Sequence, residues 1–395
     1  MLGRRYWRGK LFATVLALGL TVMVQGEAGA RLPVSGASET TAARLNQIQV
    51  IGTHDSFHIE VTGPEKAIRQ ALSPETEPEL EYAPVKLSEQ LGSQNVRQLE
   101  FNVFADPIGG MYANPLLRQA ATLGPYDPSM QLPGTKVLHA QDIDYYSHCL
   151  TLVACLREVK AWSDRNSSHV TIAIMLEFVD WPLTAPGQTE PVPGTVIPLD
   201  WTRSRMLSVE QEILSVFPRN RLVTPDNIRR PGMTLEQSVK TFGWPTVEQS
   251  RGKVLFLMDQ SDKYRAAYIQ GNPSLEGRLL FTNSFPGQPD AAFMKRYVWD
   301  AGGVEEITNL VRRGYLVRTR ADRDTIQARN NDTSTRDIAL ATGAQWVSTD
   351  YPAPGMANRF GSPYYVAIPG ATIARCNPIS STPGCDSRTI EPIRR

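Results

Sequence analysis

Short apolar runs recur along the chain and alternate with amphipathic segments, and this alternation limits the folds open to it. Eight runs have the length and composition of strands: Gln47–Gly52, Arg97–Asn102, Lys136–His139, Val170–Glu177, Lys253–Asp259, Leu279–Asn283, Leu316–Arg320 and Gln345–Asp350. Amphipathic stretches typical of helices flank many of them: Leu150–Trp162, Val209–Val216, Val304–Arg313 and Thr335–Thr342. Strands that alternate with helices favour a parallel sheet.

Eight such repeats indicate closure of the sheet into a barrel. We therefore predict an α/β fold, a TIM (β/α)8 barrel, in a single domain with long loops that spans residues 31–395. An open doubly wound sheet is the alternative, but no Gly-x-Gly-x-x-Gly turn follows the first predicted strand.

Residues 1–30 have the composition of a signal peptide. A basic head contains Arg4, Arg5, Arg8 and Lys10, an apolar core follows at Leu11–Val24, and Ala28-Gly29-Ala30 supplies small residues for cleavage. A membrane anchor is the alternative, although the apolar run is short for a span of ~20 residues. We predict a secreted or periplasmic protein, cleaved after about Ala30. Its mature part is weakly acidic, which argues against binding to nucleic acid.

The four cysteines form two close pairs along the sequence. An even number in an exported chain favours disulfides. Of the three possible connectivities, the simplest joins Cys149 to Cys155 and Cys376 to Cys385. A metal site is a weaker interpretation, because neither spacing is the short paired type that zinc favours.

Polar side chains follow the predicted strands where each strand ends, which is where catalytic groups lie in a TIM barrel. They are His54 and Asp55, Glu100 and Asn102, His139, Glu177, Asp259, Arg318 and Arg320, and Asp350. Two long segments rich in proline, Gly63–Val85 and Trp181–Asp200, follow strands that carry such groups. We expect both segments to contribute to the rim of a pocket.

Four of these side chains have the composition of a metal site. Glu100 and Asn102 are two residues apart on a strand, so they point to the same side. Asp55 and Glu177 belong to neighbouring strands and complete a set of oxygen ligands that suits calcium or magnesium. The alternative is that the acids pair with cations, for which Arg97, Arg318 and Arg320 are available.

The five histidines differ in their predicted positions. His54 and His139 lie at strand ends, and two imidazoles beside a metal ion form an acid/base pair suited to phosphodiester cleavage. We expect His58 to support them, and His148 and His169 to be structural or exposed. No Gly-x-Ser-x-Gly motif is present, so a serine hydrolase fits poorly.

Several motifs together resemble the calcium-dependent phosphatidylinositol-specific phospholipase C family of the bacterial and fungal type. They are Gly52-Thr53-His54-Asp55-Ser56-Phe57-His58, the segment from Arg97-Gln98-Leu99-Glu100-Phe101-Asn102 to Asp106-Pro107, His139 with Asp142-Ile143-Asp144, Cys149 and Cys155-Leu156, Trp162-Ser163, Glu177, Arg318-Thr319-Arg320-Ala321-Asp322 and Ser348-Thr349-Asp350-Tyr351-Pro352. The resemblance extends over most of the mature chain and implies a TIM barrel and a calcium ion.

The resemblance also implies site residues and a reaction. The catalytic histidines would be His54 and His139, and the calcium ligands Asp55, Glu100, Asn102 and Glu177. An inositol hydroxyl would attack its own phosphodiester, which releases diacylglycerol and a cyclic or hydrolysed inositol phosphate.

This sequence departs from the family pattern at two positions. The family usually has Asn where Asp55 stands and Asp where Asn102 stands, so the exchange is reciprocal and leaves the formal charge of the ligands unchanged. Three cations, Lys136, Arg318 and Arg320, are predicted either to contact the substrate or to neutralise the acidic site. Asp142, Asp144, Asp322 and Asp350 are expected to support the groups that act directly.

Two other functions are compatible with these residues. A glycerophosphodiester phosphodiesterase also uses a barrel, a Glu-x-Asp strand and two histidines, but its usual His-Arg opening is absent at His54-Asp55. A barrel that binds its ligand without turnover is the second, because Asn102 is a weaker base than Asp. We expect a monomer that touches a membrane surface transiently. Trp181-Pro182-Leu183 is either an apolar rim for that contact or a segment that packs in the core or against a loop.

Overall fold

The computed structural model describes residues 42–185 and 188–392, all within one compact unit, Glu39–Arg395. The predicted signal peptide, residues 1–30, lies outside the described residues. None of the helices in the described ranges is long and apolar enough to cross a membrane.

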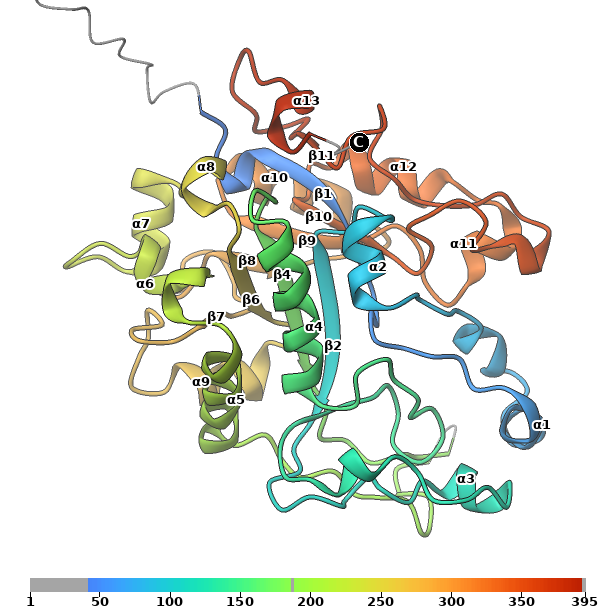
Figure 1. Ribbon diagram of the computed structural model, residues 1–395. Coiled ribbons are helices and arrows are strands. Elements are labelled where there is room, and N and C mark those ends of the chain that lie inside the picture. Colours follow the sequence, from blue (N-terminus) through green and yellow to red (C-terminus); the bar gives the residue numbers. More distant parts are fainter. Residues whose placement is uncertain (1–41, 186–187, 393–395) are drawn as a thin grey trace, which may run out of the picture. The chain divides into compact units, whose positions relative to one another are not determined.

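Parallel strands form the centre of this unit. The strands are β1 (Ile48–Thr53), β2 (Gln98–Phe104), β3 (Lys136–Val137), β4 (Ile172–Phe178), β5 (Leu222–Val223), β6 (Val254–Met258), β7 (Leu280–Phe281), β8 (Phe293–Lys295), β9 (Leu316–Arg320), β10 (Trp346–Thr349) and β11 (Ala374–Cys376). The parallel pairs run β8-β9-β10-β1-β2-β4-β6-β7, and a parallel bridge between Asn283 and Phe293 connects the two ends of this row (Figure 1). The predicted TIM-barrel class is confirmed.

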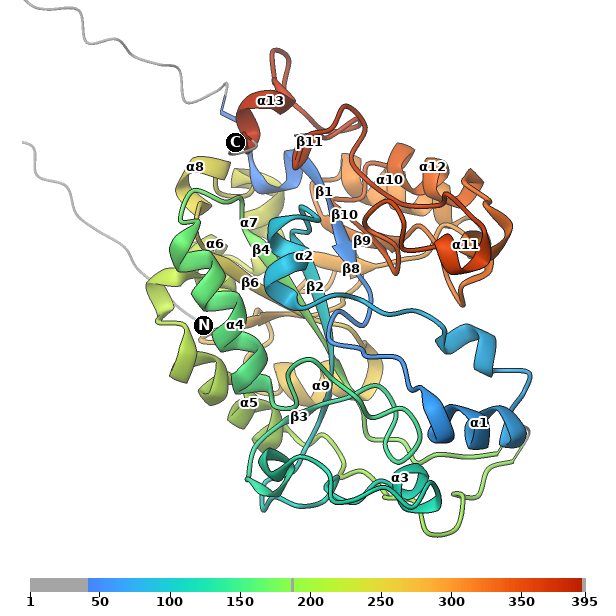
Figure 2. The same cartoon turned by 45° about the vertical axis from the view of Figure 1, so that its right-hand side comes forward.

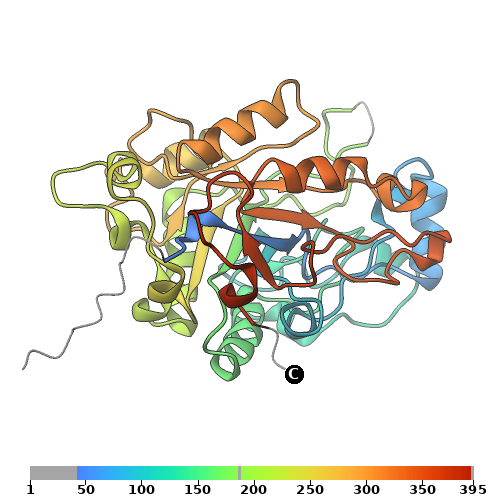
Figure 3. The same ribbon diagram turned by 90° about the horizontal axis from the view of Figure 1, so that it is seen from above.

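Helices cover the outside of the strands on opposite sides, as the view from above shows (Figure 3). They are α1 (Gly63–Leu72), α2 (Leu87–Gly92), α3 (Leu116–Ala120), α4 (Leu152–Arg165), α5 (Arg203–Val216), α6 (Pro225–Ile228), α7 (Leu235–Phe242), α8 (Val247–Ser250), α9 (Asp262–Ile269), α10 (Gly303–Arg312), α11 (Ile326–Asn330), α12 (Ser334–Ala341) and α13 (Ser387–Ile390). The four predicted helices correspond to α4, α5, α10 and α12.

The helix α4 illustrates why these segments are helical. Its residues Leu152, Leu156 and Val159 recur at helical spacing and are fully buried. The side chain of Thr151 caps the helix by accepting a hydrogen bond from the backbone N–H of Ala154 at 3.2 Å. This helix packs beside α5 and α2 on the outer side of the sheet (Figure 2).

The prediction that Lys136–His139 forms a barrel strand is wrong. Only Lys136–Val137 is a strand, β3, and it pairs antiparallel with the end of β2, outside the parallel row. An apolar run alone does not distinguish a parallel from an antiparallel partner. The barrel strand that the prediction missed is β8, which is three residues long and follows two alanines.

Both predicted disulfides are confirmed. Cys149 and Cys155 are bonded across the start of α4, with their Cα atoms 5.0 Å apart. Cys376 and Cys385 connect β11 to the segment before α13, with a Cα separation of 6.0 Å. Because β11 pairs antiparallel with β1, the second disulfide anchors the C-terminal segment to the first barrel strand.

Candidate active site

The turn after β1 presents the first site residues, and contacts to both neighbouring strands hold it. The backbone N–H of His54 donates to Thr349 O on β10 at 3.3 Å, and that of Ser56 donates to Glu100 O on β2 at 3.0 Å. Ser56 Oγ accepts a hydrogen bond from Glu100 N at 2.8 Å. Between them, Asp55 has a φ of 38°, in the left-handed region that a non-glycine residue seldom adopts. The turn is therefore fixed at the C-terminal end of the barrel.

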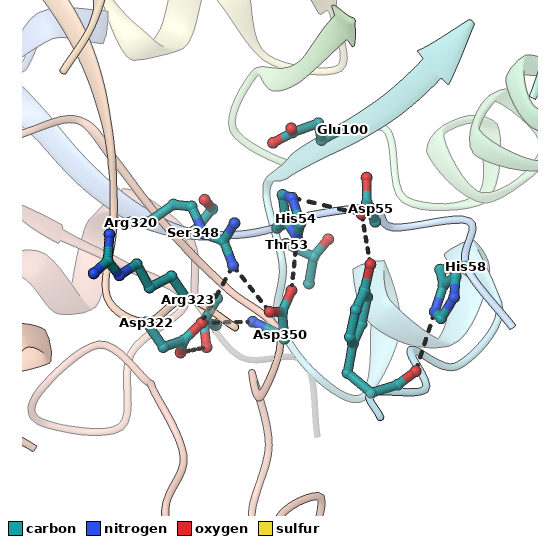
Figure 4. Close-up of polar contacts among 12 residues, drawn as sticks. Thr53, His54, Asp55, His58, Glu100, Arg320, Asp322, Arg323, Ser348 and Asp350 are labelled. Carbon is teal, nitrogen blue, oxygen red and sulfur yellow. Dashed lines mark hydrogen bonds and ion pairs between the residues drawn. The ribbon is translucent and has the colours of Figure 1, made fainter. Parts of the chain in front are cut away.

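The structure brings His54 and His139 to the same carboxylate oxygen. The Nε2 atoms of His54 and His139 lie 3.5 Å and 3.6 Å from Asp55 Oδ2. Each ring is oriented by another acid: His54 Nδ1 lies 3.0 Å from Asp350 Oδ1, and His139 Nδ1 lies 2.7 Å from Asp144 Oδ2. Figure 4 shows His54 between Asp55 and Asp350. Both imidazoles thus turn Nε2 towards the same point.

These contacts perturb the acidity of the groups. Burial alone would raise the pKa of Asp55, but the charges of His54 and His139 and a hydrogen bond from Tyr82 lower it to about 2. Burial opposes protonation of His139, yet Asp55 and Asp144 outweigh it and raise the pKa of His139 to about 9. Burial also lowers the pKa of His54, but the carboxylates of Asp55 and Asp350 outweigh burial, so the pKa is raised. Titratable groups shifted in this way are common at functional sites.

The predicted metal ligands also lie together. Glu100 and Asn102 are buried on β2, and Asn102 is the register partner of Glu177 on β4. Arg318 donates a hydrogen bond to Glu100, so the alternative of arginine pairing holds for this one acid. Burial and the charges of Asp259 and Glu100 raise the pKa of Glu177 to about 8. Repulsion from neighbouring acids thus falls mainly on Glu177, whereas Glu100 has Arg318 as a cationic partner.

A hard cation fits this arrangement. Among the described residues, Asp55 Oδ1 and Asn102 Oδ1 are buried side-chain oxygens without a hydrogen-bond partner. Leaving a buried polar atom unpaired is costly, and a bound cation would satisfy both oxygens. Carboxylate and amide oxygens are the ligands that calcium prefers.

The predicted cations lie in different surroundings. Arg320 Nη2 donates to Asp350 Oδ2 at 2.9 Å, which helps to hold the acid that orients His54. Lys136 is fully buried, and its ammonium group lies 3.1 Å from Asp106 and donates to backbone carbonyls. Arg97 is not in the site, because it pairs with Glu391 and stacks on Trp162. The three predicted cations therefore differ in position. Arg318 and Arg320 lie at the acids of the site, whereas Lys136 does not contact these acids.

The other predicted supporting residues also diverge. Asp144 serves two histidines, because His58 Nε2 lies 3.0 Å from the same oxygen that contacts His139. Asp322 accepts the backbone N–H of Asp350 at 3.1 Å. Asp142 instead accepts backbone N–H groups of Leu116 and Val196 at 3.0 Å and 2.6 Å, which connects the start of α3 to the segment after β4. The remaining histidines, His148 and His169, contact none of these acids: their ring nitrogens bond to Pro84 O, and to Ser163 Oγ and Val170 O.

Sequence reasoning missed two further residues. Tyr82, in the first predicted rim segment, donates its hydroxyl to Asp55 Oδ2 at 2.6 Å and stacks on His58 with ring centroids 4.4 Å apart. Lys295, on the missed strand β8, donates to Asp259. No motif marks Tyr82. Lys295 has no sequence signal either, because β8 is only three residues long.

Comparison with known proteins adds the family. The model of the family "Phosphoinositide phospholipase C, Ca2+-dependent" matches residues 43–378. The chain belongs to this family. Its members are Ca²⁺-dependent enzymes that act on phosphoinositides, so the predicted family, enzyme class and cofactor are confirmed.

Solved structures of such enzymes are similar to this chain. The phospholipase C of Pseudomonas sp., solved in an apo form with myoinositol, has 14% identity and a TM-score of 0.47, over 78% of this chain and 91% of that one. A second crystal form of the apo Pseudomonas enzyme has 16% identity and a TM-score of 0.48, over 85% and 95%. The enzyme of Streptomyces antibioticus has 14% identity and a TM-score of 0.48, over 81% and 98%. Among curated proteins no match was found.

Proposed function

We propose that this phospholipase cleaves phosphatidylinositol to diacylglycerol and an inositol phosphate, with His54 and His139 as its acid/base pair. The observation that carries the proposal is that two imidazoles direct Nε2 to one oxygen of Asp55, each with Nδ1 held by a separate carboxylate. With Nδ1–H donated to an acid, Nε2 is the nitrogen that takes or gives a proton.

The calcium ligands in this proposal are Asp55, Glu100, Asn102 and Glu177. Two observations support this assignment. The buried oxygens Asp55 Oδ1 and Asn102 Oδ1 have no hydrogen-bond partner, and neighbouring acids contribute to the raised pKa of Glu177. Calcium, when bound, polarises the phosphoryl group and makes a nearby hydroxyl easier to deprotonate. Glu177 would lose its proton when calcium binds, because a carboxylate that binds a metal ion must be ionised.

The residues of the chain then divide the proton transfers. One imidazole takes the proton of the inositol hydroxyl as its oxygen forms a bond to phosphorus. The other gives a proton to the diacylglycerol oxygen as the P–O bond to it breaks. The product is a cyclic phosphodiester, and water opens it in the reverse sense through the same two histidines. We assign the contacts with the phosphate to Arg318 and Arg320, and we leave Lys136 out because its ammonium group is held by Asp106.

We further propose that the enzyme is exported and that it meets its substrate at a membrane surface. Two disulfides favour an oxidising compartment. Loops that follow the barrel strands expose apolar side chains at Ile108, Leu132 and Trp181, of which Ile108 is 86% exposed. Such side chains suit shallow contact with lipid around the mouth of the barrel. That the protein acts as a monomer stays a prediction.

The test is a calcium titration of phosphatidylinositol cleavage in vesicles. We expect activity that depends on calcium and is lost by about 10²-fold or more in His54→Ala and in His139→Ala. The matched control is His148→Ala, because His148 contacts none of the acids of the site, and it should retain wild-type activity. Retained activity in either site variant removes that histidine from the mechanism.

Two outcomes would replace the proposal. Preference for glycerophosphoinositol over phosphatidylinositol would identify a glycerophosphodiester phosphodiesterase. If the wild type cleaves no diester while Asn102→Asp gains turnover, the barrel is a binding protein whose catalytic site has degenerated.

A further inference from the structure

The two oxygens of Asp55 have different surroundings. Oδ2 accepts the hydroxyl hydrogen bond of Tyr82 at 2.6 Å and lies within 3.6 Å of the Nε2 atoms of His54 and His139. Oδ1 is buried and has no hydrogen-bond partner. A carboxylate with one oxygen engaged and the other unpaired has a fixed orientation, and it offers a single oxygen to a further ligand.

We propose that Tyr82 is a positioning residue for the calcium site: its hydroxyl holds Oδ2 of Asp55, so that only Oδ1 is directed to the ion. The inference rests on the proposed function, which assigns Asp55 to calcium. It also accounts for an acid at this position, where the resemblance implies Asn. An amide offers one carbonyl oxygen, and the Tyr82 hydroxyl restricts the carboxylate to the same number.

The surroundings of Tyr82 suit a fixed donor. The residue is 3% exposed, its ring stacks on His58 at an interplanar angle of 29°, and its backbone carbonyl accepts from His58 Nδ1 at 3.1 Å. Further along the chain, Gln90 Nε2 donates to Val85 O and to Ser56 O, both at 2.6 Å. Through Gln90, the segment that contains Tyr82 is connected to the turn that carries Asp55. The ring of Tyr82 also has contacts that do not involve its hydroxyl.

Ionic contacts anchor the rest of the same rim segment. Lys66 Nζ lies 2.8 Å from Glu60 and 2.6 Å from Glu81, the residue directly before Tyr82. Thr325 Oγ1, in the loop after β9, donates to Pro78 O at 2.8 Å. The segment is therefore held against a neighbouring loop of the barrel, which fixes the place from which Tyr82 reaches the site.

The experiment removes the hydroxyl alone, in Tyr82→Phe. We expect the dissociation constant for calcium, measured by isothermal titration calorimetry without substrate, to rise by about 10- to 100-fold, as for other groups that orient a metal ligand. With saturating calcium, the KM for phosphatidylinositol should change much less. The matched control is Tyr268→Phe, because Tyr268 is also buried and donates its hydroxyl to an acid, Glu210, outside the site. Its calcium affinity should stay at the wild-type value.

A second pair of variants separates this inference from the proposed function. Asp55→Ala should weaken calcium binding strongly, and unchanged affinity there would refute Asp55 as a ligand. In Asp55→Asn, adding Tyr82→Phe should have little further effect, because the amide already offers a single oxygen. Wild-type affinity in Tyr82→Phe, with calcium binding lost in Asp55→Ala, would overturn the role of Tyr82 and leave the ligand assignment standing. A Tyr82→Phe protein that does not fold in the absence of calcium, as judged by its melting temperature, would equally overturn it.

Discussion

The buried histidine at the opposite end of the barrel from the site predicts how acid destabilises the protein. His169 is 1% exposed, its Nε2 lies 2.7 Å from Ser163 Oγ and its Nδ1 lies 2.6 Å from Val170 O. Burial, with a smaller contribution from the charge of Arg97, lowers the pKa of His169 to about 4, against an ordinary value of about 6.5. The folded protein therefore favours the neutral form of the His169 imidazole.

The sign and size of the effect follow from linkage. Between pH 6.5 and pH 4 the unfolded chain binds a proton at His169 and the folded chain does not, so the free energy of unfolding falls as pH falls. The contribution is complete above pH 6.5 and is lost progressively down to pH 4. Lowering the pKa of His169 from 6.5 to about 4 corresponds to about 3 kcal/mol of unfolding free energy.

The assay is urea unfolding of the wild type and of His169→Gln, in EDTA, at steps from pH 7.5 to pH 4. Glutamine does not titrate, and the carboxylates of the rest of the chain contribute equally to both proteins. The difference in unfolding free energy between wild type and variant should therefore fall by about 3 kcal/mol across this range. A difference that is constant with pH would refute the argument, because it would mean that the folded protein protonates His169 as easily as the unfolded chain.

Three further predictions concern the site and the core. Asp144→Asn should lower kcat by roughly 10²-fold or more with little change in calcium affinity by calorimetry, because the amide no longer orients His139; an unchanged kcat would contradict this role. Arg97→Met should reduce the free energy of unfolding in urea by about 3–5 kcal/mol, because it leaves Glu391 buried without its cation, and adding Glu391→Leu should restore much of it. Calcium at about 100 times its dissociation constant should stabilise the protein by about 2.7 kcal/mol and raise its Tm above that in EDTA, and equal Tm values would argue against a calcium site in the folded chain.

The barrel class and most of its strands were predictable because buried parallel strands are short apolar runs, and seven of the eight predicted runs contain a barrel strand. The errors lie where the apolar signal does not specify a partner. Lys136–His139 has the composition of a strand, but its backbone pairs antiparallel with the end of β2. In β8 the three residues Phe293–Lys295 are too few for an alternation to show, so the strand was visible only in the structure.

The site was predictable to the extent that its residues lie at strand ends. His54, Asp55 and Glu100 lie where strand periodicity places them, and His139 reaches the site although its segment is a loop rather than a barrel strand. Contacts made by loops were not predictable. Tyr82 meets Asp55 from a long segment that ion pairs such as Lys66–Glu81 hold together, and no local pattern encodes that arrangement.

The resemblance implies that acid and amide are exchanged between positions 55 and 102, and such an exchange has an electrostatic consequence. Asn102 is the register partner of Glu177, whose pKa is already raised to about 8 by burial and by neighbouring acids. A carboxylate at position 102 would lie directly beside that group and increase the repulsion. At position 55 the same charge faces two imidazoles and the hydroxyl of Tyr82, which lower the pKa of Asp55 to about 2. With the proposed calcium ligands, the exchange keeps the formal charge of the ligand set and reduces the repulsion within the calcium-free site.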